Sequence, residues 1–499
     1  MAAGPQHGDT KQVCAVSTKP GSVTCQAVIK LVSAARNAPA VSGPDALVAY
    51  GPGSLRSAYG LLTASKYRGK GRMVVIVDAY RDPNAAQDLA HYRSHYNLGA
   101  CTKANGCLHI VNQNGKSSPL PSANAGWAGE ESLDLDMVSA ICPKCHITLV
   151  ESYRATTKSL GIAEDTAARK SRFVSNSWSA AQWPGETAYN HYFNHSGHAI
   201  VFASGDYGYL DASAPSGYPH HPQTYPGDMQ TVVSVGGTKL VHKASGSRPW
   251  TETVWGNSSN LDQYGYPEGT QSGCASWEAK PSWQHKSGDT CLRRTQNDVA
   301  AVADPNTGVV VYDSYKSGGG NWWIYGGTSV ATPIITATFA LAGKPADRSY
   351  PASYLYVHPK SFHDVTAGAN GTCSPTYLCH GEAGFDGPTG VGTPHGTYGL
   401  STNGVNPVTL LDPGARTAQA GASFSLKITG LDQRATAKWL KYTATGLPAG
   451  LSIRGISGTT DGRISGTVSA APGTYQVVVH GQDLHTLRSN ATRFTITVS

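Results

Sequence analysis

The sequence predicts an α/β domain with a mostly parallel sheet flanked by helices, followed by a smaller antiparallel β-sandwich. Apolar, β-branched runs recur along residues 54–400 with helical patterns between several of them, as expected when helices cover both faces of a parallel sheet. The sequence pattern changes at residues 401–407, after which apolar and polar residues alternate along short runs. A chain of 499 residues is also too long for one ordinary domain, so two or three units are expected.

Six apolar runs are expected to supply strands of the first domain. They are RMVVIVDAY, HITLVES, RFVSNSW, HAIVFASGD, TVVSVGGT and VVVYDS. In the C-terminal module the side chains that face one way in an antiparallel sandwich of about a hundred residues are Phe424, Leu426, Ile428, Tyr475, Val477, Val479, Phe494, Ile496 and Val498. The phrases GLPAGLSI and DGRISGTVSAAPGTY in this module resemble the immunoglobulin-like modules that bacteria append to secreted enzymes.

Charge and cysteine usage limit the class of protein. The net charge of +7 is spread along the chain without a basic run, so no nucleic-acid partner is expected, and no apolar stretch is long enough for a membrane span. We expect a monomer. The ten cysteines form five sequence-local pairs, which favours disulfides and a secreted, extracellular protein over a zinc or redox site at CPKC. These pairs are Cys14 with Cys25, Cys101 with Cys107, Cys142 with Cys145, Cys274 with Cys291, and Cys373 with Cys379.

The segment NWWIYGGTSVATPIITATFALAG, residues 321–343, has the pattern of a nucleophilic serine. Gly326 and Gly327 allow close backbone approach, and Ser329 at a helix N-terminus would leave its own N–H free to face a developing oxyanion. Pro333 is expected only where the helix has just begun. Gly-Thr-Ser alone is a weak motif, and a serine capping a buried helix is the competing interpretation.

The groups that could activate Ser329 are carboxylates. A subtilisin-like histidine motif is missing: HSGH at residues 195–198 precedes a strand, and VDAY at Asp78 lacks the Asp-Ser/Thr-Gly pattern. Glu130 and Asp134 are four residues apart, so on a helix they share one face. Asp206 follows an apolar strand in VFASGDYG. Each also has an ordinary interpretation. Acidic residues in the first turn of a helix complement its macrodipole, which would be enough to explain Glu131 and Asp136, and Asp206 could be an ordinary turn aspartate.

Taken together, EESLD, ASGDYG and GGTSVATP, with GSLRSAYGL, VSNSWS and NDVAAVADPNTGVVVYD, resemble the sedolisins, or serine-carboxyl peptidases, over residues 54–400. The resemblance implies the subtilisin-like fold and an acyl-enzyme on Ser329. It also implies that Glu130 is the base, Asp134 shares its proton, and Asp206 lies in the oxyanion hole. A carboxylate can serve as a base in acid, where a histidine would already be protonated, and Asp206 can donate to an oxyanion only when it is protonated, in acid or with a strongly raised pKa. SNSWS at residues 175–179 is expected to line the cleft, where backbone edges could pair with an extended peptide.

The same resemblance implies one structural Ca²⁺ site. Its ligands would be the carboxylates of Asp364 and Asp386 with the carbonyls of Val365, Glu382 and Gly384, oxygen ligands of the kind calcium takes. Two aspartates in ordinary turns are the alternative. We expect an N-terminal extension with a local disulfide at residues 1–53, a peptidase domain at 54–403 and an immunoglobulin-like β-sandwich at 404–499.

The expected function is therefore an acid-acting serine-type peptidase on protein or peptide substrates, either an endopeptidase or a tripeptidyl-peptidase. A pro-domain that has been removed and a branch that folds without one both fit the sequence. Two other classes stay open: a catalytically inactive peptidase fold serving as a binding or adhesion protein, and a neutral subtilisin-like protease. The first need not keep all four residues Glu130, Asp134, Asp206 and Ser329, and the second lacks its histidine motif.

Overall fold

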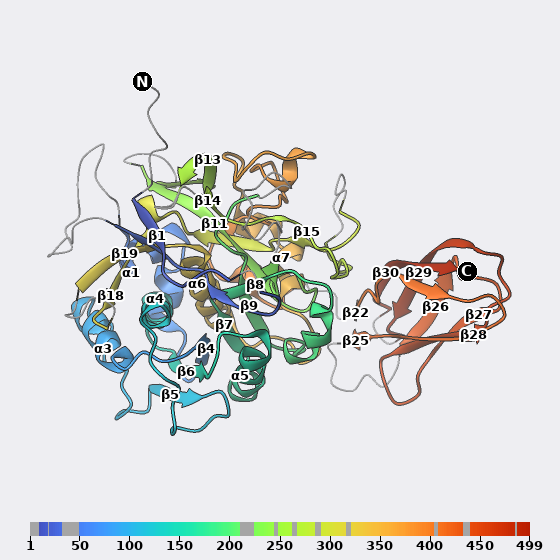
Figure 1. Ribbon diagram of the computed structural model, residues 1–499, viewed down its shortest axis with the longest axis horizontal. Helices are drawn as coiled ribbons and strands as arrows, with labels where there is room; N and C mark the ends of the chain where they lie inside the picture. Colours follow the sequence, from blue (N-terminus) through green and yellow to red (C-terminus); the bar gives the residue numbers. More distant parts are fainter. Residues whose placement is uncertain are drawn as a thin grey trace.

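The computed structural model describes residues 9–17, 19–31, 49–209, 224–243, 248–261, 267–284, 291–315, 321–403, 408–432, 440–484 and 487–499. Figure 1 shows a large α/β body and, to one side of it, a smaller β body that contains the C-terminus. Each body has its own hydrophobic core. The predicted boundaries at 53/54 and 403/404 stay predictions, and residues 404–407 lie outside the described part of the chain.

The large body is built on one sheet, as the fold class predicts. Its order is β12-β11-β9-β7-β4-β6-β5, with β17 also paired to β11, and every neighbouring pair is parallel except β11 with β12. These strands are β4 (Met73–Ala79), β5 (Leu108–Asn112), β6 (His146–Ser152), β7 (Phe173–Asn176), β9 (Ala199–Ala203), β11 (Val233–His242), β12 (Trp250–Val254) and β17 (Val299–Val302). The expectation of a mostly parallel sheet is confirmed.

The run VVVYDS was wrongly assigned to this sheet. It forms β18 (Val309–Asp313) in a separate four-stranded sheet of order β1-β3-β19-β18, every pair of which is antiparallel. The partner strands are β1 (Thr10–Gln12), β3 (Val28–Lys30) and β19 (Asn321–Gly326). The physical reason is that an apolar run fixes a buried strand but not its neighbour. Conversely, the strands β5, β12 and β17 join the main sheet although they were not among the six runs.

Two long helices pack against each other on this sheet and bring the candidate site together. Helix α4 (Ala125–Ile141) begins after Asn124, whose side chain accepts hydrogen bonds from the N–H groups of Gly126 and Trp127. Helix α6 (Thr328–Ala342) is buried along nearly its whole length. The other helices are α1 (Pro52–Ala58), α2 (Leu62–Tyr67), α3 (Ala85–His95), α5 (Thr157–Lys170) and α7 (Ala352–Val357). No helix of the described residues is long and apolar enough to cross a membrane.

Short strands border the main sheet. One three-stranded sheet has the order β10-β8-β2 and contains β8 (Trp178–Ala181), part of the SNSWS segment. Its other members are β2 (Thr24–Cys25) and β10 (Thr224–Tyr225). Three two-stranded pairs complete the large body: β13 (Gly256–Leu261) with β14 (Pro267–Gly269), β15 (Gly273–Cys274) with β16 (Thr295–Gln296), and β20 (Phe362–His363) with β21 (Thr393–Pro394).

All five predicted cysteine pairs are disulfides. Each joins cysteines separated by 3 to 17 residues, so each closes a small local loop. The Cys142–Cys145 pair follows α4, as expected for a structural bridge rather than a redox motif that opens a helix. Because both cysteines of CPKC are in this disulfide, they do not form a zinc site, and their position after the helix does not fit a redox motif.

The C-terminal module is a β-sandwich with the predicted apolar face. The side chains assigned inward are buried in its core or packed against it. Its sheets have the orders β23-β30-β29-β26, β24-β28-β27 and β22-β25, formed by β22 (Val408–Leu410), β23 (Arg416–Ala418), β24 (Ser423–Ile428), β25 (Gly430–Asp432), β26 (Lys441–Thr445), β27 (Leu451–Gly455), β28 (Gly462–Thr467), β29 (Gly473–Gln482) and β30 (Ser489–Val498). One edge pair, β23 with β30, is parallel, so the expectation of a wholly antiparallel module was wrong there.

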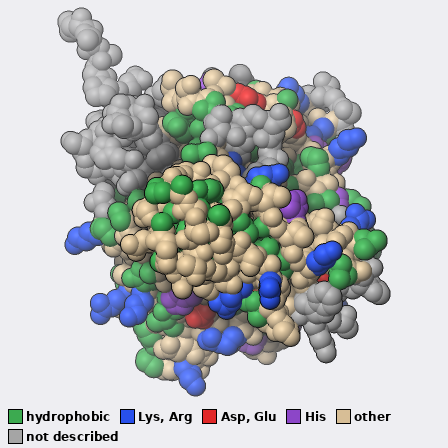
Figure 2. Space-filling model, turned by 90° about the vertical axis from the view of Figure 1, so that its right-hand side faces the viewer, with side chains coloured by type: hydrophobic (Ala, Val, Ile, Leu, Met, Phe, Trp, Pro, Cys, Tyr) green, Lys and Arg blue, Asp and Glu red, His purple; other side chains and the backbone are tan. Residues whose placement is uncertain are grey.

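The two bodies touch at a polar contact. The Gln230 side chain donates to the Asp412 carbonyl oxygen at 3.0 Å and accepts from the Asp412 N–H at 3.2 Å. On the face shown in Figure 2, Lys and Arg side chains are scattered rather than gathered into one patch.

Candidate active site

Ser329 lies in the first turn of α6, directly after β19 and the two glycines. Gly327 has φ +94°, a conformation that favours glycine. A Cβ atom at Gly327 would lie 2.2 Å from the carbonyl oxygen of Gln26 and 2.7 Å from Oδ2 of Asp206. Two oxygens thus leave no room for a side chain at Gly327, which explains the glycine before Thr328 and Ser329. Ser329 itself is fully buried, with 0% of its surface exposed.

Glu130 and Asp134 lie on α4 as predicted, and both are fully buried. The Ser177 hydroxyl donates to Asp134 Oδ1 at 2.7 Å, and the Ser329 hydroxyl donates to the Ser177 carbonyl oxygen at 3.2 Å. Burial raises the pKa of Glu130 well above its ordinary value, the charges of Asp134 and Asp78 raise it further, and the neighbouring Ser329 side chain lowers it. The serine and the two carboxyls therefore belong to one cluster.

Pro333 lies in the second turn of α6, later than the sequence predicts. Proline has no N–H, so the carbonyl of the residue four positions earlier, Ser329, loses its helical donor. The Ser177 hydroxyl lies 3.4 Å from that carbonyl oxygen. Ser177 thus contacts both Asp134 and the backbone of Ser329, and it ties the SNSWS segment to the site.

Asp206 follows β9 and points at the start of α6. The N–H and the hydroxyl of Thr328 donate to Asp206 Oδ1 at 2.7 and 2.8 Å. Burial raises the pKa of Asp206 to about 7, although these bonds and one from Gln12 lower it. The carboxyl is therefore protonated in acid, where it can donate a hydrogen bond.

The expectation that the Ser329 N–H is free was wrong. It donates to the carbonyl oxygen of Gln26 at 2.9 Å. No sequence pattern predicts this contact, because the two residues are about three hundred positions apart.

Asp78 is a buried carboxyl that the sequence analysis set aside for lacking the subtilisin motif. It lies at the end of β4, and burial raises its pKa to about 8. Its charge raises the pKa of both Glu130 and Asp134. Its position at the carboxyl end of a central parallel strand, where α/β folds gather functional groups, was the signal that could have identified it.

Glu131 and Asp136 are not first-turn acids that complement the helix macrodipole. Helix α4 carries no acidic residue in its first turn. Glu131 Oε2 accepts from the Asp82 N–H at 2.9 Å, and Asp136 Oδ2 accepts from the Tyr312 N–H at 3.0 Å. Both are buried acceptors of backbone donors, and these bonds turn them toward segments other than Ser329.

The histidines of HSGH contact backbone carbonyl groups instead of the serine. His195 pairs with the Tyr192 carbonyl oxygen at 2.8 Å, and His198 contacts the carbonyl oxygens of Ser196 and Ala168 at 3.0 and 3.1 Å. Their placement after a 3₁₀ helix fits the interpretation as helix-end residues.

The predicted calcium residues converge on one loop. The Gly384 N–H donates to Asp364 Oδ2 at 2.8 Å, and the Glu382 N–H donates to Asp386 Oδ2 at 3.0 Å. The Val365 carbonyl oxygen faces the same loop, 2.7 Å from a Cβ built on Gly381. The described residues contain no cluster of three or more His, Cys, Asp or Glu side chains that could hold a metal ion, which agrees with a set that has only two carboxylates.

The chemistry of these groups fits a cation. Burial raises the pKa of Asp386 to about 8, and the charge of Asp364 raises it further. The Glu382 side chain accepts from the Thr376 hydroxyl at 2.6 Å through Oε1. Two neighbouring carboxyls disfavour each other's ionised form, and a bound Ca²⁺ ion would favour it. The carbonyl oxygens nearby are of the kind that calcium takes as ligands.

The fold and site define a subtilisin-like α/β domain whose serine is surrounded by carboxyls. The model described as "Subtilase family" matches residues 122–358, and the one described as "Putative Ig domain" matches residues 406–499. Sedolisin of Pseudomonas sp. (strain 101) is 32% identical over 206 residues, covering 40% of this chain and 33% of that protein. Kumamolisin of Bacillus sp. (strain MN-32) is 28% identical over 358 residues, covering 66% and 59%.

Among solved structures, Pseudomonas sedolisin, a serine-carboxyl proteinase complexed with two molecules of pseudo-iodotyrostatin, superimposes with a TM-score of 0.58 at 23% identity. The match covers 70% of this chain and 96% of that one, and it confirms the fold. The chain is thus similar to sedolisin and kumamolisin over part of its length, and its C-terminal part matches an Ig-like domain. It spans between a third and three fifths of the curated relatives' length.

Proposed function

We propose that this protein is an acid-acting serine-carboxyl peptidase that hydrolyses protein or peptide substrates through an acyl-enzyme on Ser329. The observation that carries the proposal is that Ser177 contacts both the Ser329 hydroxyl and Asp134, which places Ser329 beside a buried cluster of carboxyls on α4 and β4. The described residues at this cluster include no histidine that could serve as base. A carboxylate is the remaining proton acceptor.

Glu130 is proposed as the general base and Asp134 as the group that shares its proton. Glu130, Asp134 and Asp78 oppose one another's ionisation, so they titrate as a unit, and the side chains of Ser329 and Ser177 favour the ionised forms of Glu130 and Asp134. Activity is therefore expected to end at low pH, where the last ionised carboxyl among Glu130, Asp134 and Asp78 takes up a proton. Asp134, fixed by Ser177 at 2.7 Å, orients the pair.

Asp206 is proposed as the donor that stabilises the oxyanion together with the Ser329 N–H, once a substrate carbonyl replaces the Gln26 carbonyl oxygen at that N–H. With its pKa at about 7, Asp206 keeps its proton in acid and loses it above neutrality. Thr328 occupies Oδ1 with two hydrogen bonds, so the side chain is held in one orientation. Preorganised donors of this kind contribute about 10²–10³ in rate each. The high-pH limit of activity is therefore the ionisation of Asp206.

The reaction follows from these roles. Ser329 Oγ attacks the carbonyl carbon of the substrate while its proton passes to Glu130, and the resulting oxyanion accepts hydrogen bonds from Asp206 and the Ser329 N–H. The proton then passes to the departing amine as the C–N bond breaks and the acyl-enzyme forms. Water, deprotonated by the same carboxyl, hydrolyses the ester and restores the Ser329 hydroxyl.

Asp364, Val365, Glu382, Gly384 and Asp386 are proposed to hold one Ca²⁺ ion. When bound, the ion would neutralise the charges of these carboxylates and connect the loop at residues 381–386 to the end of β20, so its proposed role is structural. Extracellular location is proposed from the five disulfides, because such bridges persist in oxidising compartments. Both internal cleavage and tripeptide removal are compatible with the proposed chemistry.

The test is hydrolysis of a denatured protein across pH 2 to 9, with Ser329→Ala prepared in parallel. We expect activity below pH 7 that the substitution abolishes. Activity centred at neutral or alkaline pH would contradict the roles of Glu130 and Asp206. Activity that survives in Ser329→Ala would show that the nucleophile lies elsewhere.

A further inference from the structure

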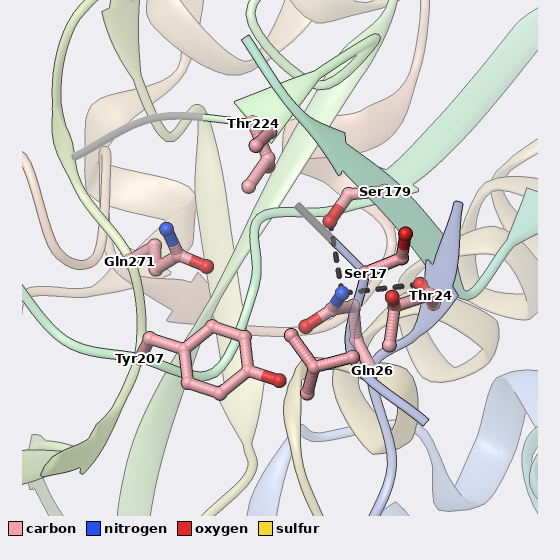
Figure 3. Close-up of a pocket in the computed structure, with 9 residues that line it drawn as sticks. Ser17, Thr24, Gln26, Ser179, Tyr207, Thr224 and Gln271 are labelled. Carbon is pink, nitrogen blue, oxygen red and sulfur yellow. Dashed lines mark hydrogen bonds between the residues drawn. The ribbon is translucent and has the colours of Figure 1, made fainter. Parts of the chain in front are cut away.

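Strands β8 and β10 form one wall of the pocket beside the candidate active site. They pair antiparallel, with Thr224 opposite Ala181. Ser179, Ala181 and Thr224 line the pocket, and Figure 3 shows Ser179 and Thr224 there on neighbouring strands. Ser177, whose carbonyl oxygen accepts from the Ser329 hydroxyl, directly precedes β8. The position of this wall therefore sets where a bound peptide lies relative to the serine.

Buried side chains hold the two strands together just beyond the pocket. The Gln182 side chain, directly after β8, donates to Asp228 Oδ2 and accepts from the Ser276 N–H at 3.3 Å. The Asp228 N–H donates to the Thr224 carbonyl oxygen of β10 at 3.2 Å. Asp228 is thus connected to both strands, to β10 through its backbone and to the end of β8 through its carboxyl.

Glu186 holds the next residue after Gln182. It is the first residue of the 3₁₀ helix η1 (Glu186–Tyr192), and its Oε2 accepts from the Trp183 N–H at 2.9 Å. The Trp183 ring packs edge to face against Tyr225 of β10, with ring centroids 5.4 Å apart. Two carboxyls, those of Glu186 and Asp228, therefore anchor consecutive residues at the same end of β8.

These two carboxyls and that of Glu278 disfavour one another's ionised form. Burial, with the charges of Asp228 and Glu278, raises the pKa of Glu186 to about 10. Burial and the charge of Glu278 raise the pKa of Asp228 well above its ordinary value, against smaller opposing effects of Gln182 and Arg294. The neutral form of the Glu186–Asp228 pair is therefore favoured while the wall is closed.

Glu278 has partners of its own. Burial raises its pKa to about 7, although Asn190, whose side-chain amide donates to Glu278 Oε1 at 2.7 Å, and the charges of Arg294 and Arg293 lower it. Arg294 donates to Asp298 Oδ2 at 2.5 Å. The charged or titratable side chains that face this cluster are Tyr189, Tyr225, Glu278, Arg293, Arg294 and Asp298. Glu278 thus adds a negative charge beside the pair as the pH passes 7.

One oxygen of each carboxyl in the pair lacks a donor. Glu186 Oε1 and Asp228 Oδ1 have no hydrogen-bond partner among the described residues, although both side chains are fully buried, with 0% exposed. A buried carboxylate oxygen without a donor is unfavourable. A proton on the pair removes one charge and supplies the missing donor, so the pair requires a proton to stay buried.

We propose that Glu186 and Asp228 are positioning residues that share one proton and hold the β8–β10 wall in place only while they keep it. This inference rests on the proposed function, because it takes the pocket as part of the peptide-binding cleft. As the pH rises, the proton passes to solvent, and the two carboxylates reach water by separating from Gln182 and Trp183. Binding of substrate then has an upper pH limit of its own, separate from the limit that Asp206 sets on the chemical step.

The pH dependence of this opening has a definite sign and slope. The closed wall holds one proton on the pair, and above the ordinary carboxyl pKa of about 4 the open wall holds none. Opening therefore becomes about tenfold more favourable for each pH unit between 5 and 8, and it is suppressed in acid.

The test is hydrogen exchange of the backbone amides in residues 178–186 and 224–229, measured in Ser329→Ala so that no self-digestion occurs. After correction for the intrinsic pH dependence of exchange, we expect protection of these amides to fall about tenfold per pH unit between pH 5 and 8. Strand β4 serves as the internal reference, and its protection is expected to fall less steeply.

Glu186→Gln, added to Ser329→Ala, tests the pair itself, because its side-chain amide replaces the protonated carboxyl with a group that cannot ionise. We expect its protection in these segments to change by less than about threefold from pH 5 to 8. Glu131→Gln is the matched control: Glu131 is also fully buried with a raised pKa but lies on α4, so the steep slope should persist. Thermal melting checks folding, and Asp228→Asn replaces Glu186→Gln if the latter does not fold.

A second measurement connects the pair to substrate binding. We determine kcat and KM for a peptide substrate between pH 4 and 7 in chains that keep Ser329. At pH 7 we expect a KM at least about threefold lower in Glu186→Gln than in the unmodified chain, because apparent affinity scales with the closed fraction. We expect the same pH dependence of kcat in both.

The outcomes separate the two proposals. Protection that does not change with pH, or a slope that is unchanged in Glu186→Gln or shared by β4, would overturn the role of the pair and leave the peptidase assignment intact. Equal KM values in the two chains at pH 7 would overturn the positioning role. The expected exchange result in a chain that hydrolyses nothing at any pH would contradict the peptidase assignment alone.

Discussion

Replacing Glu130 by Gln removes the proposed base while keeping its size, and Glu131→Gln is its matched control. The two residues are adjacent on α4, are both fully buried, and both have a pKa raised well above the ordinary value by burial. They differ in what they contact. The Ser329 side chain is close enough to Glu130 to lower its pKa, whereas Glu131 accepts from the Asp82 N–H at 2.9 Å, a bond that a Gln carbonyl oxygen can also accept.

The expected magnitude follows from the role of a general base. Such groups contribute about 10²–10⁴ in rate, which corresponds to about 3–5 kcal/mol of transition-state stabilisation at 1.36 kcal/mol per factor of ten. We expect the Glu130→Gln variant to lose activity within this range and Glu131→Gln to stay within about threefold of the unmodified chain.

The assay is the initial rate of hydrolysis of a denatured protein at pH 4, at equal concentrations of folded protein, with the thermal unfolding temperature of each variant recorded. A Glu130→Gln variant that keeps more than a tenth of the activity would refute the assignment of the base. Equal losses in the two variants would show that the effect comes from disturbing α4 rather than from removing a proton acceptor.

Three further outcomes are expected. Glu164 is fully buried, and burial raises its pKa to about 8. Its contribution to stability is therefore complete below about pH 4 and is lost as the pH rises to 8. Calorimetry should show the unfolding temperature falling over this pH window, and falling less steeply in Glu164→Gln. The side-chain amide of Asp206→Asn can donate a hydrogen bond at any pH, so we expect the high-pH limit of activity, near pH 7 in the unmodified chain, to move upward in this variant. Asp206→Ala is expected to lose about 10²–10³ in rate. Unchanged limits in the pH-rate profiles would contradict the oxyanion role. Added Ca²⁺ should raise the unfolding temperature of the unmodified chain but not of Asp386→Asn, and a chelator should reverse the gain; an equal response of both would exclude this loop as the site.

Local sequence patterns predicted what short-range geometry determines. The spacing of Glu130 and Asp134 placed both on one helix face, and the close cysteine pairs matched the disulfides. Alternating apolar residues also identified the sandwich face.

Contacts between distant segments were not predictable in this way. The strand preference of VVVYDS is real, but its partner is chosen by packing against β19 and β3. The bond from the Ser329 N–H to Gln26 depends on the N-terminal segment crossing the cleft, and Asp78 joins the site only because the sheet places β4 beneath α4. Such tertiary contacts leave no periodic signal in the sequence.

The most direct test of the central claim is to identify the covalent intermediate. A peptide ester is mixed with the acid-treated chain at pH 4, the reaction is quenched with strong acid within one turnover, and the protein is digested and analysed by mass spectrometry. The carboxyl-activated serine predicts the acyl group on Ser329, absent from Ser329→Ala. An acyl group on another residue, or turnover of the ester that leaves no Ser329 adduct at any quench time, would contradict the account.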